Sequence, residues 1–290
     1  MPGGTALPVD LARRLGVDRS SATPVHGGDT ATAFCVETLG GPCFVKTHRS
    51  PPPYFFATEA TGLDWLAERG ARVPEVIAVS DEAPAHLALR WIDIGPRPAG
   101  GDRTEAELGR MLAELHRPRT GDRFGRPDRR TTGSRGLPNE RFDTWVESFA
   151  ANRLLPLARL ACDEGSLPDT TIRGLETIAE RLADLGGDPE PPSLLHGDLW
   201  AGNRLVDSSG ENWLIDPAAQ FGHREFDLAM MRLFGGFGPA AFAAYNEAFP
   251  LASGWDDRIE LHQLAPLAVH AIKFGGGYVA ATAHAVDHYR

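Results

Sequence analysis

Residues 196–203 read HGDLWAGN and are followed by Asp216-Pro217, and these motifs are the most informative part of the chain about its architecture. Asp198 lies five positions before Asn203, a spacing that can place a carboxylate and an amide oxygen on one side of a short loop. The residues that follow Asn203 predict a strand pair turning at 208–210, which would return Asp216 beside the loop. Carboxylate and amide oxygens suit a hard divalent cation such as Mg²⁺. Each residue alone would more simply make a turn, but the ordered set indicates a metal site.

A lysine and a glutamate in the N-terminal part form a second group. Residues 31–37 and 42–47 predict two strands joined by a glycine-containing turn. Residues 54–69 predict a helix, because apolar residues recur there at helical spacing. Lys46 lies on the second strand, and Glu59 lies thirteen residues later in the helix. A lone strand lysine is usually only solvated and a lone helical glutamate is usually exposed, but these two are placed to form an ion pair.

The order of the predicted elements indicates two lobes. Residues 93–101 are rich in Pro and Gly, and the chain beyond them is mainly helical, with helices predicted at 105–116, 141–160, 170–185 and 227–233. We therefore expect an α+β protein with a small β-rich N-terminal lobe, 1–93, and a larger, mainly helical C-terminal lobe, 94–290. Residues 121–139 show no periodicity, and their length predicts a functional loop, with disorder as the alternative.

The composition argues against several classes of protein. The formal net charge of −10 disfavours broad electrostatic capture of nucleic acid or of an anionic membrane. The three cysteines include no CxxC pair, so neither a disulfide framework nor a zinc site is indicated. The first residues lack the pattern of a secretion signal, and no run of about 18 apolar residues occurs. We expect a cytoplasmic protein without nucleic-acid or membrane partners, and the sequence does not indicate an oligomeric state.

The HGD…N…D pattern resembles the catalytic loop and metal-binding aspartate of the protein-kinase superfamily. The resemblance implies a protein-kinase-like two-lobed fold that uses ATP and Mg²⁺. Asp198 would orient the acceptor hydroxyl, while Asn203 and Asp216 would hold Mg²⁺. Lys46 would contact the α and β phosphates of ATP, and Glu59 would hold Lys46 forward.

Two further segments match positions that contact ATP in such kinases. Gly27 and Gly28 precede the first strand, where glycines would let the backbone approach phosphates. This signal is weak, because two glycines in a loop most often only make a turn. Leu89 and Trp91 would belong to the connector between the lobes and wall the adenine ring, with an ordinary core strand as the alternative.

Longer segments resemble one family within this superfamily, the fructosamine kinases. The matching segments are 194–203, 214–218, 222–230, 233–237, 125–139, 145–149 and 274–278. The resemblance implies phosphorylation of the sugar 3-hydroxyl of a ketosamine, that is, of a fructosamine or ribulosamine adduct, free or on a protein. The 3-phosphate makes the adduct labile, so the family is associated with deglycation.

The resemblance also suggests which residues meet the acceptor. Trp200 would offer an aromatic wall to the sugar or its amine, with core packing as the alternative. His223 and Glu225 would line the acceptor pocket, although the loop could equally use them to brace itself. His196 and Asp227 would support the catalytic loop, although Asp227 is also suited to cap a helix.

One segment departs from the family pattern. Residues 126–134 are polar and Arg-rich where relatives carry a Trp and an Asn-Phe-Ile-Gly run. An Arg-rich entrance would favour an acidic or phosphorylated adduct, whereas exposed arginines are more often only solvated.

Two other functions are compatible with the same core motif. One is a phosphotransferase acting on an aminoglycoside, choline or another small hydroxyl compound. The other, disfavoured because the candidate phosphate and metal residues are all present, is an inactive kinase-like module that only binds a nucleotide.

Overall fold

The computed structural model describes residues 6–25, 31–94, 101–187 and 189–290. It divides into two compact units. Unit 1 comprises Met1–Ala99 and Leu205–Asp216, and unit 2 comprises Gly100–Arg204 and Pro217–Arg290. The sequence predicted a division near residue 93; the compact unit runs to Ala99, and a short later segment, Leu205–Asp216, also belongs to it.

The returning segment carries the strand pair expected from the sequence, β7 (Arg204–Val206) and β8 (Asn212–Leu214). Backbone hydrogen bonds attach it to unit 1, since Ser208 N donates to Asp93 O at 3.1 Å and Leu214 N donates to Arg72 O at 2.8 Å. These partners lie far from the hairpin in the sequence, so no local pattern could have placed it there.

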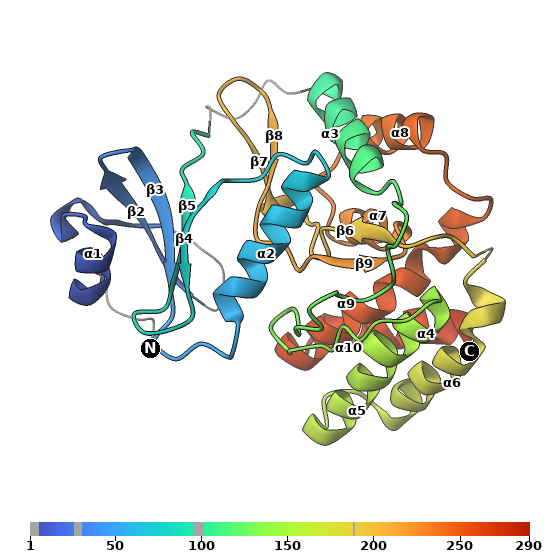
Figure 1. The fold of residues 1–290 in the computed structure, drawn as a ribbon. Coiled ribbons are helices and arrows are strands. Elements are labelled where there is room, and N and C mark those ends of the chain that lie inside the picture. The colour runs from blue at the N-terminus through green and yellow to red at the C-terminus, as the bar shows by residue number, and fades with distance from the viewer. Residues whose placement is uncertain (1–5, 26–30, 95–100, 188) are drawn as a thin grey trace. The chain divides into compact units, whose positions relative to one another are not determined.

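Unit 1 is built on a five-stranded antiparallel sheet in the order β1-β2-β3-β5-β4. Its strands are β1 (Thr23–Val25), β2 (Thr32–Thr38), β3 (Gly41–Thr47), β4 (Val76–Ser80) and β5 (His86–Arg90). Helix α1 (Val9–Leu15) lies on one side of the sheet and α2 (Phe55–Glu68) on the other (Figure 1).

Alternation along the strands decides which helix each side chain meets. Val45 and Ala88 belong to the core under α1, whereas Leu87 and Leu89 pack with the buried face of α2. Lys46 lies directly opposite Leu87 in the β3–β5 register and so shares the α2 face of the sheet. The strand period therefore directs Lys46 toward the helix that carries Glu59.

Unit 2 is mainly helical. Its helices are α3 (Asp102–Leu115), α4 (Trp145–Phe149), α5 (Leu155–Glu164), α6 (Asp169–Leu185), α7 (Glu225–Phe234), α8 (Pro239–Ala248), α9 (Ile259–Phe274) and α10 (Gly277–Tyr289), with a π-helical turn at Ala150–Leu154 between α4 and α5. Two short strands, β6 (Ser193–Leu195) and β9 (Gln220–Gly222), pair antiparallel. No helix in the described ranges is long and apolar enough to cross a membrane.

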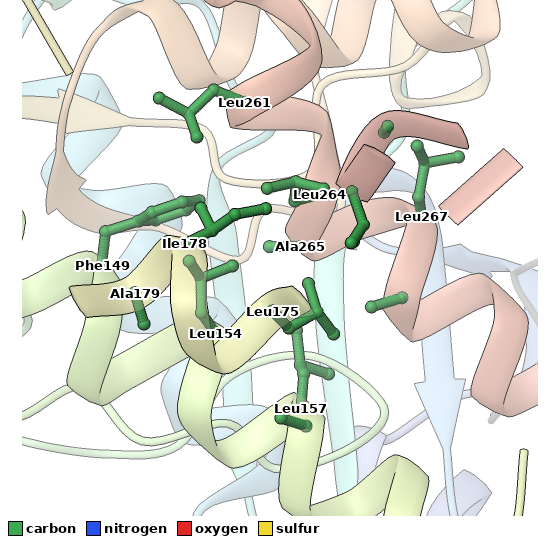
Figure 2. Close-up of a cluster of buried hydrophobic side chains, with 14 of the residues drawn as sticks. Phe149, Leu154, Leu157, Leu175, Ile178, Ala179, Leu261, Leu264, Ala265 and Leu267 are labelled. Carbon is green, nitrogen blue, oxygen red and sulfur yellow. The ribbon is translucent and has the colours of Figure 1, made fainter. Parts of the chain in front are cut away.

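The core of unit 2 lies where α5, α6 and α9 meet (Figure 2). Leu175, Ile178 and Leu182 recur along α6 at spacings of three and four and are 0% exposed. They pack with Leu157 of α5 and Leu264 of α9. Full burial of one such side chain is worth about 1.5–3 kcal/mol, so this apolar stripe supplies much of the stability that holds the site in place.

Candidate active site

In unit 1, Lys46 lies between two carboxylates. Lys46 Nζ donates to Glu59 Oε1 at 2.8 Å and to Asp216 Oδ1 at 2.7 Å. The lysine and Glu59 side chains are only 8% and 11% exposed. The expected pair of strand lysine and helix glutamate is thus present, and Asp216 joins it from the end of the β7–β8 segment.

The charges of this group follow from burial and proximity. Burial alone would lower the pKa of Lys46, but Glu59 and Asp216 raise it above the usual lysine value, so Lys46 remains an ammonium ion. Burial raises the pKa of Glu59 to about 7, although the lysine opposes this shift and Asp216 adds to it. A raised pKa of Glu59 favours its neutral form, which would weaken its attraction for the lysine. Asp216 also contacts Lys46, so we take Lys46 as charged.

Asp216 has an unusual backbone conformation. Its φ is +56°, in the left-handed region that non-glycine residues seldom adopt. Such a conformation costs on the order of 1–3 kcal/mol and is found mostly at functional sites. Asp216 Oδ1 bonds to Lys46, and no other protein hydrogen bond to the carboxylate occurs among the described residues, with the side chain 41% exposed. The remaining oxygen is a hard ligand suited to Mg²⁺.

In unit 2, the buried strand β6 leads into the loop that carries Asp198 and Asn203. Asn203 Nδ2 donates to Asp198 O at 2.8 Å and to Asp198 Oδ2 at 3.1 Å. The amide hydrogens of Asn203 thus face Asp198, which leaves its carbonyl oxygen as a candidate metal ligand. Gly197 has φ +81°, and a Cβ there would lie 2.2 Å from Ala218 O, so this turn requires glycine.

Asp227 holds the start of this loop. Its Oδ2 accepts a hydrogen bond from His196 N at 2.7 Å, and its Oδ1 accepts one from Gly197 N at 2.9 Å. Burial would raise the pKa of Asp227, but hydrogen bonding and charge from His116, with smaller contributions from His196 and Gly197 N, lower it below its usual value. Arg224 is the N-cap of α7, and Asp227 lies in the first turn, so its carboxylate serves the loop rather than the helix end. His196 is fully buried, and its Nδ1 accepts from Asp198 N at 3.2 Å.

Trp200 is 43% exposed, so core packing does not explain it. Its ring lies over Gly202, where a Cβ would come within 2.1 Å of Trp200 Cη2. A second aromatic group contains Phe234, Phe274 and Tyr278, from the segments 233–237 and 274–278 that resemble the fructosamine kinases. The sequence predicted no role for it. There His270 lies with its ring centre 5.0 Å from those of Phe234 and Tyr278, and Phe274 beside it is 55% exposed.

The structure favours bracing over acceptor contact for Glu225 and His223. They are 2% and 3% exposed. Glu225 accepts two hydrogen bonds from Arg258, at 2.6 Å from Nη2 and 2.9 Å from Nε. His223 Nδ1 accepts from Glu225 N at 3.3 Å. Burial, followed by the nearby basic groups, lowers the pKa of His223 to about 3 although Glu225 opposes the shift, so its ring is neutral.

His223, Glu225 and His262 lie close enough together to raise the question of a metal site. His262 Nε2 is 3.3 Å from Glu225 Oε2 but lacks hydrogen-bond geometry to it. Arg258 occupies both oxygens of Glu225, and a backbone N–H occupies His223 Nδ1. The guanidinium of Arg258 already neutralises Glu225 and places a positive charge beside the cluster, which disfavours a cation there, so we assign this cluster a structural role.

Arg126, in the Arg-rich segment, does not belong to an open basic entrance. Arg126 is 0% exposed, forms two hydrogen bonds of 2.9 Å with Asp128 and donates to Ala219 O. Arg129 and Arg130 lie near Glu140 and Asp128, respectively. The alternatives of an anion-attracting entrance and of simple solvation both fail for Arg126, because Asp128 neutralises its buried guanidinium.

Gly27, Gly28, Leu89 and Trp91 were also expected to contact ATP, and the structure describes only the last two. Gly27 and Gly28 lie outside the described residues. Leu89 is 3% exposed within the core under α2, and Trp91 is half-buried just after β5, with its N–H donating to Pro42 O at 3.2 Å. Leu89 therefore has the core-strand position that was the alternative to an adenine contact.

A strand lysine bound to a glutamate of the following helix is characteristic of kinase-like phosphotransferases, and that is the class of enzyme to which this chain belongs. More specifically, the chain is a member of the fructosamine kinase family, whose model matches residues 10–290. The family resemblance and the kinase-like fold class expected from the sequence are both confirmed, and the runner-up family of aminoglycoside and choline phosphotransferases is set aside.

Relatives cover nearly the whole chain. A probable ketoamine kinase from Thermus thermophilus is 36% identical over 281 residues, which covers 97% of this chain and 98% of that protein. The chloroplastic protein-ribulosamine 3-kinase of Arabidopsis thaliana is 34% identical over 270 residues, covering 91% and 81%. A crystal structure of a candidate fructosamine-3-kinase from Thermobifida fusca has a TM-score of 0.86 at 36% identity and covers 99% of both chains.

Proposed function

We propose that this enzyme transfers the γ-phosphoryl group of ATP to the 3-hydroxyl of a ketosamine, a sugar–amine adduct of the fructosamine or ribulosamine type. The observation that carries the proposal is the buried ammonium of Lys46 held by both Glu59 and Asp216. A structural ion pair needs one partner, whereas a lysine held by a helix glutamate and by a strained aspartate is arranged as in ATP-dependent phosphoryl transfer.

Each candidate residue has a distinct role in this reaction. Lys46 contacts the α and β phosphates, and Glu59 fixes the direction of the lysine. Asn203 and Asp216 are the residues that would hold Mg²⁺ through oxygen atoms, and bound Mg²⁺ would supply positive charge beside the phosphates. Asp198 accepts the hydrogen bond of the acceptor hydroxyl and orients that oxygen for attack. Because the transition state of phosphoryl transfer is loose, positioning supplies most of the catalysis.

The acceptor class is supported by exposed aromatic side chains and by the relatives. Trp200 and Phe274 present apolar ring surface of the kind that packs against the C–H faces of a sugar. The Thermus and Arabidopsis relatives bear the names ketoamine kinase and ribulosamine 3-kinase. We propose free sugar–amine adducts as substrates, together with glycated proteins where the adduct is accessible.

The test is the Asp198→Asn variant, assayed with radiolabelled ATP against ribulose-amine and fructose-amine adducts, free and on protein. Turnover should fall about 10²–10⁴-fold, while thermal unfolding followed by circular dichroism stays close to that of the parent. A variant with near-normal turnover would remove Asp198 from this role. A parent that binds nucleotide firmly but phosphorylates none of the adducts would instead support the inactive kinase-like module.

A further inference from the structure

A buried chain of three side chains lies behind the loop of Asp198 in unit 2. His116 follows the last residue of α3, Asp227 lies on α7 and Tyr245 lies on α8. They are 0%, 0% and 1% exposed. His116 Nε2 lies 3.2 Å from Asp227 Oδ2, and His116 Nδ1 lies 2.9 Å from Tyr245 Oη.

The helix packing explains why this chain of contacts forms. His116, at the C-terminal end of α3, lies seven residues after Gly109, about two helical turns, and Ala241 and Tyr245 lie four apart on one face of α8. A Cβ at Gly109 would lie 2.0 Å from Ala241 O, so the two helices touch through their backbones at that point. This contact brings the two faces close enough for Tyr245 to reach His116.

The directions of the hydrogen bonds follow from the chemistry of the groups. Asp227 is ionised and can only accept, so His116 Nε2 carries a hydrogen and donates it. Burial raises the pKa of Tyr245, so its phenol keeps its hydrogen and can donate it to His116 Nδ1. The chain Tyr245, His116, Asp227 therefore runs in one direction and ends on a carboxylate.

Three donors fix the Asp227 carboxylate, and two of them are backbone N–H groups of the loop. His196 N and His116 Nε2 share Oδ2, while Gly197 N takes Oδ1. Removal of the His116 donor would let the carboxylate rotate and carry these two peptide groups with it. They immediately precede Asp198, so its side chain would move as well.

Resting on the proposed function, we propose that His116, backed by Tyr245, is a positioning residue for phosphoryl transfer that orients Asp198 through Asp227. His116 is fully buried and is bound to Asp227 and Tyr245, so its effect falls on turnover rather than on substrate affinity. A displacement of about 1 Å at a reacting group can cost about 100-fold in rate, which sets the upper end of the expected loss.

The first test compares His116→Leu with His116→Gln. Leucine fills similar volume without a donor, whereas the glutamine amide can still donate to Asp227. The leucine variant should lose about 10- to 100-fold in kcat, with KM for ATP and for the ketosamine within about threefold of the parent. The glutamine variant should recover most of that kcat, although both variants lack the histidine. Equal kcat losses in the two variants, or a folded leucine variant with parental kcat, would overturn the proposal.

The second test measures the coupling and does not depend on the leucine variant alone. Tyr245→Phe should lower kcat, and its effect should be non-additive with that of His116→Gln, because the two side chains share one hydrogen bond. Tyr289→Phe is the matched control, since Tyr289 is also buried and donates its hydroxyl to Asp257 O away from the loop. Additive effects at 116 and 245, or an equal loss in Tyr289→Phe, would refute the positioning role. A parent that phosphorylates no ketosamine would refute the proposed function instead.

Discussion

The ion pair of Glu225 with Arg258 allows a sharp test of whether Glu225 binds the acceptor or supports the fold. Glu225 begins α7 and accepts two hydrogen bonds from Arg258, with side-chain exposures of 2% and 9% for the two residues. The change Glu225→Gln keeps the shape and one acceptor oxygen but removes the negative charge. It leaves the Arg258 guanidinium buried without its counter-ion.

The expected cost follows from this geometry. Two unit charges about 4 Å apart interact by about 4 kcal/mol at the effective dielectric constant of a protein. Removal of one partner of a buried pair typically costs 3–5 kcal/mol. We therefore expect Glu225→Gln to lower the free energy of unfolding by about 3–5 kcal/mol. The double change Glu225→Met with Arg258→Met should cost less than this, because no buried charge remains.

Urea unfolding followed by far-UV circular dichroism measures this difference, with ketosamine kinetics on the same preparations. The control is Asp287→Asn, which removes the partner of Arg290 in an exposed pair 3.4 Å apart and should cost at most about 1 kcal/mol. A Glu225→Gln variant of parental stability, combined with a raised KM for the ketosamine, would refute the reasoning. That result would return Glu225 to the acceptor pocket.

Three further predictions follow from other parts of the structure. Gly109→Ala should destabilise the enzyme by about 1–3 kcal/mol, since its Cβ would lie 2.0 Å from Ala241 O; an unchanged urea midpoint would contradict the close helix contact. His223 has its pKa lowered from 6.5 to about 3, so its stabilising contribution is complete above pH 6.5 and is lost as the pH falls toward 3. The free energy of unfolding should then fall by at most about 1.4 kcal/mol per pH unit on this account, and His223→Gln should flatten the slope in urea titrations between pH 7.5 and 5. Lys46→Met should lower turnover about 100-fold in the labelled-ATP assay, and a variant that turns over normally would exclude Lys46 from phosphate binding.

Several features of the fold and of the candidate site could be predicted from short stretches of the sequence. The strand that carries Lys46, the helix that carries Glu59 and the loop from His196 to Asn203 all follow from apolar spacing and from short motifs. The hydrogen bond between Asn203 and Asp198 also depends only on a five-residue loop. Such features are visible in sequence because their partners lie within a few residues or on adjoining elements.

Long-range contacts decided the remainder. The bonding of the β7–β8 segment to Arg72 and Asp93, the burial of Arg126 beside Asp128 and the Glu225–Arg258 pair each changed an expectation drawn from the sequence. Sequence patterns report which residue types occur and how they are spaced, and so they predicted the family, the strands around Lys46, several of the helices and the loop from His196 to Asn203. Whether a charged side chain faces solvent or a buried partner depends on segments brought together only by packing, and for that reason only the tertiary structure showed that Arg126 and Glu225 have buried partners.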